Sequence, residues 1–143
     1  MFRRLLVGFD GSAMANEAIG AALRLASDLS GEVAVIAVTP VARGGNSPER
    51  GETQEIEAAR LRALAEERRR QAGHGQVHWS VEVIEATEPS ATLRSVFQNR
   101  GFDLIVLGRT GADRGRRGGL GHVPRQLIEK SHAPVLVVGE GNT

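Results

Sequence analysis

Short apolar runs alternate along this chain with longer stretches in which apolar residues recur at helical spacing. The apolar runs cover residues 5–9, 33–38, 77–84, 102–108 and 134–139, and each predicts a β-strand. Three of the runs are nearly continuous in Val, Ile and Leu, which is typical of parallel strands that are covered on both faces. Residues 77–84 instead alternate apolar and polar positions. This pattern predicts a strand with one wet face, near an edge of the sheet.

The stretches between the runs predict helices. Apolar residues of segment 13–29 form one helical stripe, and we expect Ser12 to cap its start and Gly31 its end. Segment 52–72 has glutamates in its first turns and arginines in its last, as the helix dipole favours. Two shorter helices are predicted to open at Pro89 and Pro124 and to end near residues 101 and 130.

Strands and helices in strict alternation predict an α/β fold: an open five-stranded parallel sheet, Rossmann-like, with helices on both faces. The chain of 143 residues shows no internal repeat, so residues 1–143 are expected to form a single domain. Segment 40–51, rich in Gly and Pro, is expected to be a mobile loop within that domain. Ligands of such sheets bind beyond the carboxyl ends of the strands. The positions of interest are therefore Asp10, Val38 and the segment that starts at Gly108.

Composition excludes several classes of protein. There are 18 basic and 17 acidic residues, four Phe, one Trp and no Tyr, so nucleic-acid binding is disfavoured. The absence of cysteine excludes disulfides and thiolate catalysis. No apolar run approaches the roughly 20 residues of a membrane span, and the apolar stretch near the start is too short for a signal peptide. We expect a cytoplasmic protein without a membrane partner.

The segment LGRTGADRGRRGGLGHVP, residues 107–124, holds six glycines and four arginines between a predicted strand and a predicted helix. It could be a solvated basic connection, or a loop that holds an anion against the unpaired N–H groups of the helix start. Composition alone leaves these two interpretations open. The common phosphate-binding patterns GxxxxGK[ST] and GxGxxG are both absent.

The spacing of the glycines separates the two interpretations. Gly108, Gly111 and Gly121 are separated by two and then nine residues, and His122 and Val123 follow. This arrangement resembles the nucleotide-binding signature G-x2-G-x9-G-[ST] of the universal stress protein family. The opening LLVGFDGSAMANEAI, the sequence Val-Thr-Pro at 38–40 and the closing HAPVLVV also resemble that family. The resemblance extends over residues 4–138, nearly the whole chain.

The resemblance implies a sheet in the order 3-2-1-4-5, a homodimer formed through the last strand, Pro134 to Val138, and an adenine nucleotide at the carboxyl edge. ATP, ADP and AMP are all candidates, with Mg²⁺ as a candidate companion of the phosphates. The implied contacts run from adenine or ribose to the phosphates, which main-chain N–H groups would surround. The residues implied are Asp10, Val38, Gly108, Gly111, Gly121, His122 and Val123.

His122 departs from the signature, which has Ser or Thr at this position. A hydroxyl is small and can donate to a phosphate oxygen without crowding it. Imidazole also donates, but it is larger and can displace the terminal phosphate. It gains a charge near pH 6.5, so a contact with phosphate would be pH-sensitive. The sequence therefore leaves open which nucleotide fits beside His122.

Three functions remain to be compared. The first is a nucleotide-binding stress-response protein that acts as a sensor, or as an interaction module for an unidentified protein partner. The second is a nucleotide-independent dimeric stress protein with a degenerate site, and the third is a slow ATPase. We predict no catalytic residue and no metal site: Asp10 and Ser12 can simply cap a helix, and Gly75 separates His74 from His78. The chain is therefore expected to bind rather than to catalyse.

Overall fold

The described part of the chain contains one parallel sheet of five strands. The computed structural model describes residues 2–41, 48–110 and 120–140. The strands are β1 (Arg4–Gly8), β2 (Glu32–Thr39), β3 (His78–Glu85), β4 (Leu104–Gly108) and β5 (Val135–Val138). Their order in the sheet is β3-β2-β1-β4-β5, and all neighbouring pairs are parallel. This confirms the predicted α/β fold and strand order.

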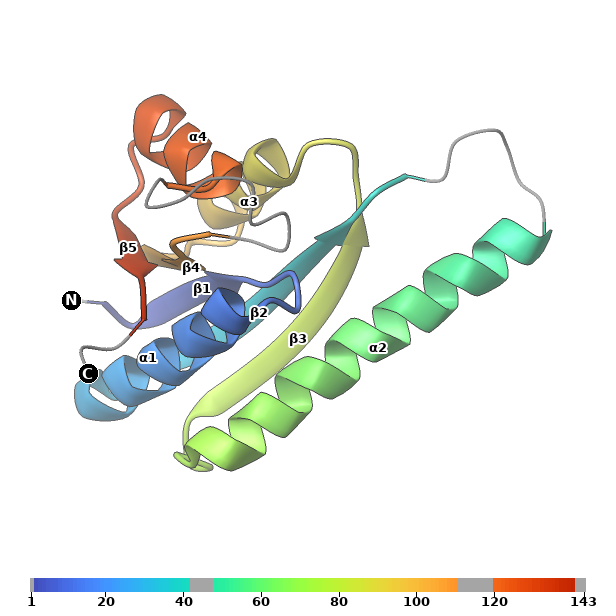
Figure 1. Cartoon of the computed structure of the whole chain (residues 1–143). Coiled ribbons are helices and arrows are strands. Elements are labelled where there is room, and N and C mark those ends of the chain that lie inside the picture. Colours follow the sequence, from blue (N-terminus) through green and yellow to red (C-terminus); the bar gives the residue numbers. More distant parts are fainter. Residues whose placement is uncertain (1, 42–47, 111–119, 141–143) are drawn as a thin grey trace.

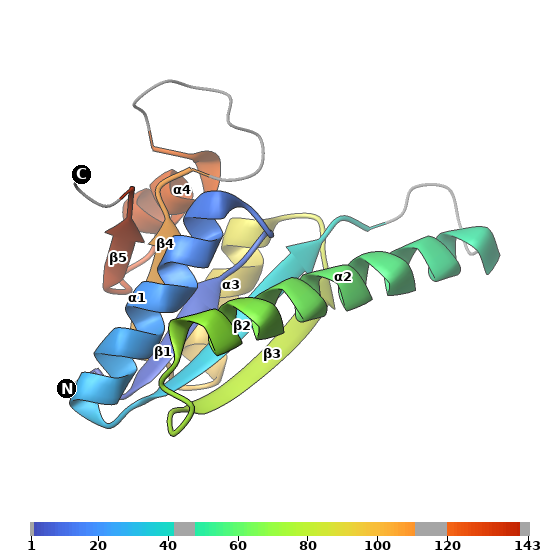
Figure 2. The same ribbon diagram turned by 60° about the horizontal axis from the view of Figure 1, so that its bottom comes forward.

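Helices cover both faces of the sheet. They are α1 (Ala13–Leu29), α2 (Pro48–Ala72), α3 (Pro89–Asn99) and α4 (His122–Lys130). Helices α1 and α2 lie on one face, and α3 and α4 lie on the other (Figures 1 and 2). Side chains alternate between the faces, so Leu5 and Val7 of β1 belong to the core under α1, whereas Leu6 belongs to the core under α3 and α4. The centre of the sheet is therefore buried on both sides.

Helix α2 is longer than the sequence pattern predicted. It begins at Pro48, four residues before the expected start, so the end of the predicted loop 40–51 is helical. Proline fits a first helical position because its missing N–H would have no partner there. The first turns reach past the end of the sheet (Figures 1 and 2), where Gln54 Nε2 donates to Pro40 O at 2.7 Å. Residues 42–47 of the predicted loop lie outside the described residues.

The two ends of α1 differ in how well the sequence predicted them. Ser12 is the N-cap as expected, and its Oγ accepts a hydrogen bond from the Ala15 N–H at 3.2 Å. At the other end the left-handed residue is Ser30, with φ of 56°, so the prediction of Gly31 was one residue late. The Gly31 N–H donates to Ala26 O at 2.8 Å, and a Cβ there would lie 2.8 Å from Arg3 O. Glycine at 31 is thus explained by close packing.

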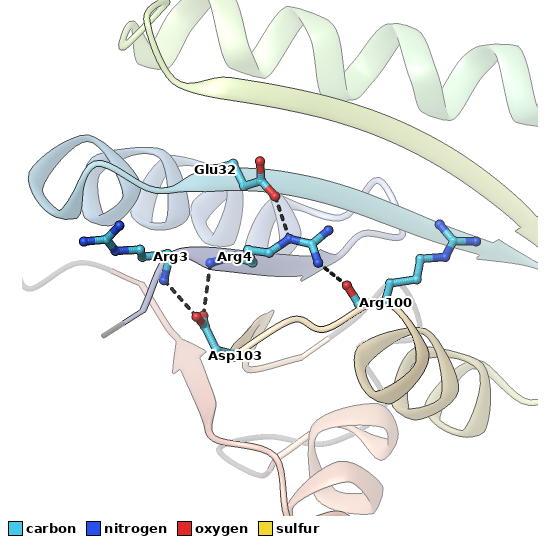
Figure 3. Close-up of polar contacts among 5 residues, drawn as sticks. All are labelled: Arg3, Arg4, Glu32, Arg100 and Asp103. Atoms are coloured by element: carbon cyan, nitrogen blue, oxygen red, sulfur yellow. Dashed lines mark hydrogen bonds and ion pairs between the residues drawn. The ribbon is translucent and has the colours of Figure 1, made fainter.

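A polar network fastens the start of β1 at the amino-terminal edge of the sheet (Figure 3). The Asp103 carboxylate accepts hydrogen bonds from the N–H groups of Arg3 and Arg4 at 2.9 and 3.1 Å. The Arg4 side chain pairs with Glu32 of β2 at 2.6 Å, donates to the carbonyl of Arg100 and lies over the Phe102 ring. This edge is therefore occupied by structural contacts.

Strand β3 lies at a sheet edge, as its alternating pattern predicted. Two arginines of α2 reach this edge: Arg62 Nη1 donates to Val81 O of β3 at 2.9 Å, and Arg69 Nη2 donates at 3.1 Å to the carbonyl of Val77, the residue before β3. Such contacts cover main-chain acceptors that an edge strand would otherwise present to another chain. Within residues 2–41, 48–110 and 120–140, no helix is both long and apolar enough to cross a membrane.

Candidate functional site

A cavity of about 520 Å³ opens at the carboxyl-terminal edge of the sheet. It lies where β1, β2 and β4 end and where α1, α3 and α4 begin, which is the edge that the fold class predicted. A volume of about 300–1,000 Å³ is usual for small-molecule sites. The lining residues are Gly8, Phe9, Asp10, Ala15, Ile36, Val38, Pro40, Pro89, Leu93, Leu107, Gly108, Thr110, Gly121, His122, Val123 and Pro124.

The structure brings together the positions that the family resemblance implied. Six of the seven line this one cavity, although they come from four separate segments of the chain. Gly111, the seventh, lies outside the described residues, as does the rest of segment 111–119. The six that line the cavity are Asp10, Val38, Gly108, Gly121, His122 and Val123.

The apolar walls of the cavity were not predicted. Ile36, Leu93 and Leu107 belong to the core under α3 and α4, and all three also line the cavity. They sit in strands and a helix whose apolar pattern indicates only burial, so no local feature of the sequence marks them as cavity residues. Gly8 leaves them room, since a Cβ there would lie 2.6 Å from Leu107 Cδ2 and 3.0 Å from Leu93 Cδ1.

Asp10 has a structural role at the mouth of the cavity. Its Oδ1 accepts a hydrogen bond from the Ser12 N–H at 3.0 Å, across Gly11, whose φ is +82°. A positive φ suits glycine because it has no Cβ. The Asp10 side chain is nevertheless exposed, and it is the one carboxylate among the described lining residues. Asp10 therefore orders the turn between β1 and α1 and also borders the cavity.

The start of α4 differs from the prediction. The helix begins at His122, so Pro124 is its third residue and does not open it. The N–H of the N-cap, Gly121, donates to Arg109 O at 2.8 Å, and the Arg109 N–H donates to Val138 O at 2.8 Å. These bonds hold both ends of the connection between β4 and α4 beside β5. They also occupy the Gly121 N–H, which the resemblance had implied for phosphate.

Polar side chains are few in this cavity. Asp10, Thr110 and His122 are the polar or charged side chains among the described lining residues, and the His122 imidazole is exposed. The described residues contain no group of three or more His, Cys, Asp or Glu side chains that could hold a metal ion. The site therefore combines a largely apolar wall with the amino-terminal ends of α1, α3 and α4.

Comparison with known proteins finds similar proteins over nearly the whole chain. The model of the universal stress protein family matches residues 1–139. A universal stress protein of Methanocaldococcus jannaschii is 28% identical over 142 residues, which cover 96% of this chain and 82% of the relative. The universal stress protein UspA from Lactobacillus plantarum has a similar structure, with a TM-score of 0.80, 22% identity and coverage of 96% and 97% of the two chains.

Two further similar structures are complexes with nucleotides. The universal stress protein from Archaeoglobus fulgidus in complex with dAMP has a TM-score of 0.68 and 21% identity, with 96% of this chain and 99% of that chain covered. A family protein from Arabidopsis thaliana with AMP bound has a TM-score of 0.66 and 14% identity, with 97% and 92% covered. At these identities the likeness shows a shared fold. Because the family model spans residues 1–139 and the strand order is the one that the resemblance implied, this chain belongs to the universal stress protein family.

Proposed function

We propose that this chain is a cytoplasmic adenine-nucleotide-binding protein that acts as a stress-response sensor or interaction module. One observation carries the proposal: six of the nucleotide-binding positions that the family resemblance implied, scattered over residues 10–123, line a single cavity. The fold alone brings strand ends to this edge, but these six residues also border an open cavity of about 520 Å³, which suits a small-molecule ligand. The complexes of structurally similar proteins with dAMP and AMP support the same class of ligand.

The two ends of the cavity suit the two ends of a nucleotide. Val38 and Pro40 at the end of β2 offer apolar surface and main-chain groups to a flat adenine ring. The start of α4 offers N–H groups and the positive end of the helix dipole to phosphate. Asp10 lies near the β1 end, where its carboxylate can accept from ribose hydroxyls. We propose that Gly108 lies near ribose and that Gly111 adds to the phosphate contacts.

Binding without turnover is the second part of the proposal. Asp10 is the one carboxylate among the described lining residues, and its Oδ1 already accepts the Ser12 N–H. Asp10 is thus the single described lining carboxylate that could serve as a general base, and it also has a structural role in the turn before α1. Where Mg²⁺ accompanies the phosphates, the same carboxylate is its candidate protein ligand. ATP hydrolysis in this cavity would then be slow and incidental, and a nucleotide would act by shifting the populations of conformations.

A thermal-shift experiment tests nucleotide binding. ATP, ADP and AMP are added with and without Mg²⁺, beside CMP as a control, after release and identification of any nucleotide that copurifies. We expect the adenine nucleotides to raise the melting temperature, because a ligand that binds only the folded state stabilises it. The absence of a shift with all three, and of any copurified nucleotide, would favour the degenerate-site alternative.

A pair of matched variants localises the effect. Val38→Trp places an indole in the cavity, whereas Val41→Trp makes the same change three residues later, outside the lining. The first variant is expected to abolish the nucleotide-induced shift, and the second to retain it. Circular dichroism confirms that both variants are folded.

We also propose a homodimer in which the β5 strands of two chains pair. The carbonyls of Pro134 and Val138 accept hydrogen bonds from Ile105 of β4 and from Arg109, which follows β4. The main-chain groups of Val135 and Val137 therefore point away from the sheet. Strand β5 carries no charged residue and Leu136 is 38% exposed, whereas the other edge is contacted by Arg62 and Arg69. An uncharged edge of this kind favours pairing with a second copy.

A further inference from the structure

The first turns of α2 contact one part of the cavity rim, the end of β2. Gln54 Nε2 donates to the carbonyl oxygen of Pro40 at 2.7 Å. Pro40 lines the cavity, and so does Val38, two residues before it. On the other side of the same strand end, the Ala86 N–H donates to Thr39 O at 2.9 Å. The end of β2 is thus held from two sides, and Gln54 supplies one of these contacts.

The middle of α2 packs against a second part of the rim, the turn between β1 and α1. Asp10 lines the cavity from this turn, and Gly11 follows it. A Cβ at Gly11 would lie 3.3 Å from Leu61 Cδ2 and 3.4 Å from Leu64 Cδ1, so both leucines lie against the turn. No described residue of α2 lines the cavity itself. The helix therefore supports the rim from outside the cavity.

The first turns of α2 are less firmly packed than the rest of the helix. None of the side chains that the structure describes in residues 49–60 is buried, whereas Leu61 and Ala65 are 4% and 0% exposed. Gly51 weakens these turns further, because glycine is a poorer helix former than alanine. Helix turns with few buried contacts open locally at a low free energy. The order of these turns therefore depends on contacts such as the one between Gln54 and Pro40.

We propose that Gln54 is a positioning residue of the nucleotide cavity, and that a bound nucleotide orders the first turns of α2 through it. A ligand that contacts Val38 and Pro40 fixes the main chain at the end of β2. The Pro40 carbonyl is then held where it accepts the hydrogen bond from Gln54, so the helical state of these turns is favoured. Linkage makes the effect reciprocal, since ordered turns in return favour binding.

This coupling would present the bound state on the surface of the molecule. The first turns of α2 reach past the end of the sheet (Figures 1 and 2), so a change in their order is exposed to other molecules. The inference rests on the proposed nucleotide binding and adds the way in which binding is communicated to the rest of the chain.

Hydrogen exchange of the whole chain, measured by mass spectrometry, tests the coupling with saturating ATP and with saturating AMP in separate samples. We expect the amides of residues 51–60 to exchange about two- to tenfold more slowly with nucleotide, the factor to which one hydrogen bond corresponds. Slower exchange that is confined to the segments lining the cavity would overturn the inference and leave the proposed function standing. If neither nucleotide changes the exchange of any segment, both are overturned.

The variant Gln54→Met tests the role assigned to Gln54. Methionine has a similar length and helix propensity and no charge, but it cannot donate to Pro40. We expect the nucleotide-induced protection of residues 51–60 to be lost, and the affinity in calorimetric titration to fall about two- to tenfold. Protection is a difference between samples with and without nucleotide, so a general loss of stability would not imitate this result.

The matched control is Gln71→Met, the same change at an exposed position in the last turn of α2. It is expected to keep the wild-type affinity and the wild-type protection of residues 51–60. Protection that persists in Gln54→Met, or that is lost equally in Gln71→Met, would overturn the role of Gln54.

Discussion

Some residues of this site are needed for packing and also line the cavity proposed to hold the ligand. Gly108 is the clearest example. It belongs to the glycine signature and lines the cavity. A Cβ at this position would lie 2.7 Å from the carbonyl carbon of Met14 and 2.8 Å from Met14 Cβ. Glycine is therefore needed where the first turn of α1 crosses the end of β4, whether or not a nucleotide is bound.

This packing leads to a prediction for Gly108→Ala. The variant is expected to lose about 1–3 kcal/mol of unfolding free energy, because the added methyl group meets main chain that cannot rotate away. Urea denaturation of the ligand-free protein measures the loss. Gly75→Ala is the matched control, since a Cβ at Gly75 would meet nothing within 4 Å. Equal stability of Gly108→Ala and the wild type would show that α1 can move away from β4 at little cost.

The starts of α1, α3 and α4 border the site, and the sequence predicted the starts of α1 and α3 correctly but placed those of α2 and α4 too late. Helix α2 begins at Pro48 instead of residue 52, and α4 begins at His122 instead of Pro124. Proline is compatible with any of the first positions of a helix, because their N–H groups lack intrahelical partners. Its presence therefore marks a helix start without fixing its first residue. In α4 the proline is the third residue, and it supplies no N–H to the cavity.

The end of α3 carries an ion pair with a pH dependence that can be predicted. The Arg100 guanidinium contacts both carboxylate oxygens of Glu82 at 2.6 and 3.2 Å, and this hydrogen bonding lowers the pKa of Glu82. A lowered pKa in the folded state means that the stabilisation is present above the pKa of the unfolded chain. The stabilisation is lost as the pH falls through the lowered pKa that Glu82 has in the folded protein.

Glu82→Gln is therefore expected to lower the unfolding free energy near neutral pH and to have no effect once the carboxylate is protonated. The loss is about 0.5 kcal/mol, because both side chains are nearly half exposed and solvent screens the pair. Urea denaturation at about pH 7 and about pH 3 measures it. Glu129→Gln, at an exposed position of α4, serves as the control. A loss of equal size at both pH values would show that it does not come from the ionised pair of Glu82 and Arg100.

At the scale of the whole molecule, the sequence was sufficient for the architecture. Continuous apolar runs in β1, β2 and β4 required a sheet buried on both faces, and the strict alternation with helices required parallel strands. The six described positions that the family resemblance implied were also predicted to lie together, because strand ends of a parallel sheet meet at one edge. The apolar wall formed by Ile36, Leu93 and Leu107 could not be predicted from the sequence. Its residues are far apart in sequence, and only tertiary packing shows which of their surfaces remain uncovered.

The proposed dimer is a prediction about the molecule as a whole. Leu136→Arg places a charge on β5 and is expected to give monomers in sedimentation experiments, because a buried unpaired charge opposes the pairing of edges. The matched control is Ile56→Arg, which changes an apolar residue of α2 that is 64% exposed and distant from β5 in the fold. It is expected to remain a dimer. A wild-type monomer, or a dimer that survives Leu136→Arg, would contradict the proposed interface.

The central claim is that an adenine nucleotide occupies the cavity at the carboxyl edge of the sheet. Amide chemical shifts of the ¹⁵N-labelled protein, followed while AMP is added, test it most directly. We predict the largest changes at Gly8, Val38, Gly108, His122 and Val123, and none at the amino-terminal edge around Arg4 and Asp103. Shifts that stay constant throughout the titration, or that move chiefly at the amino-terminal edge, would contradict the claim.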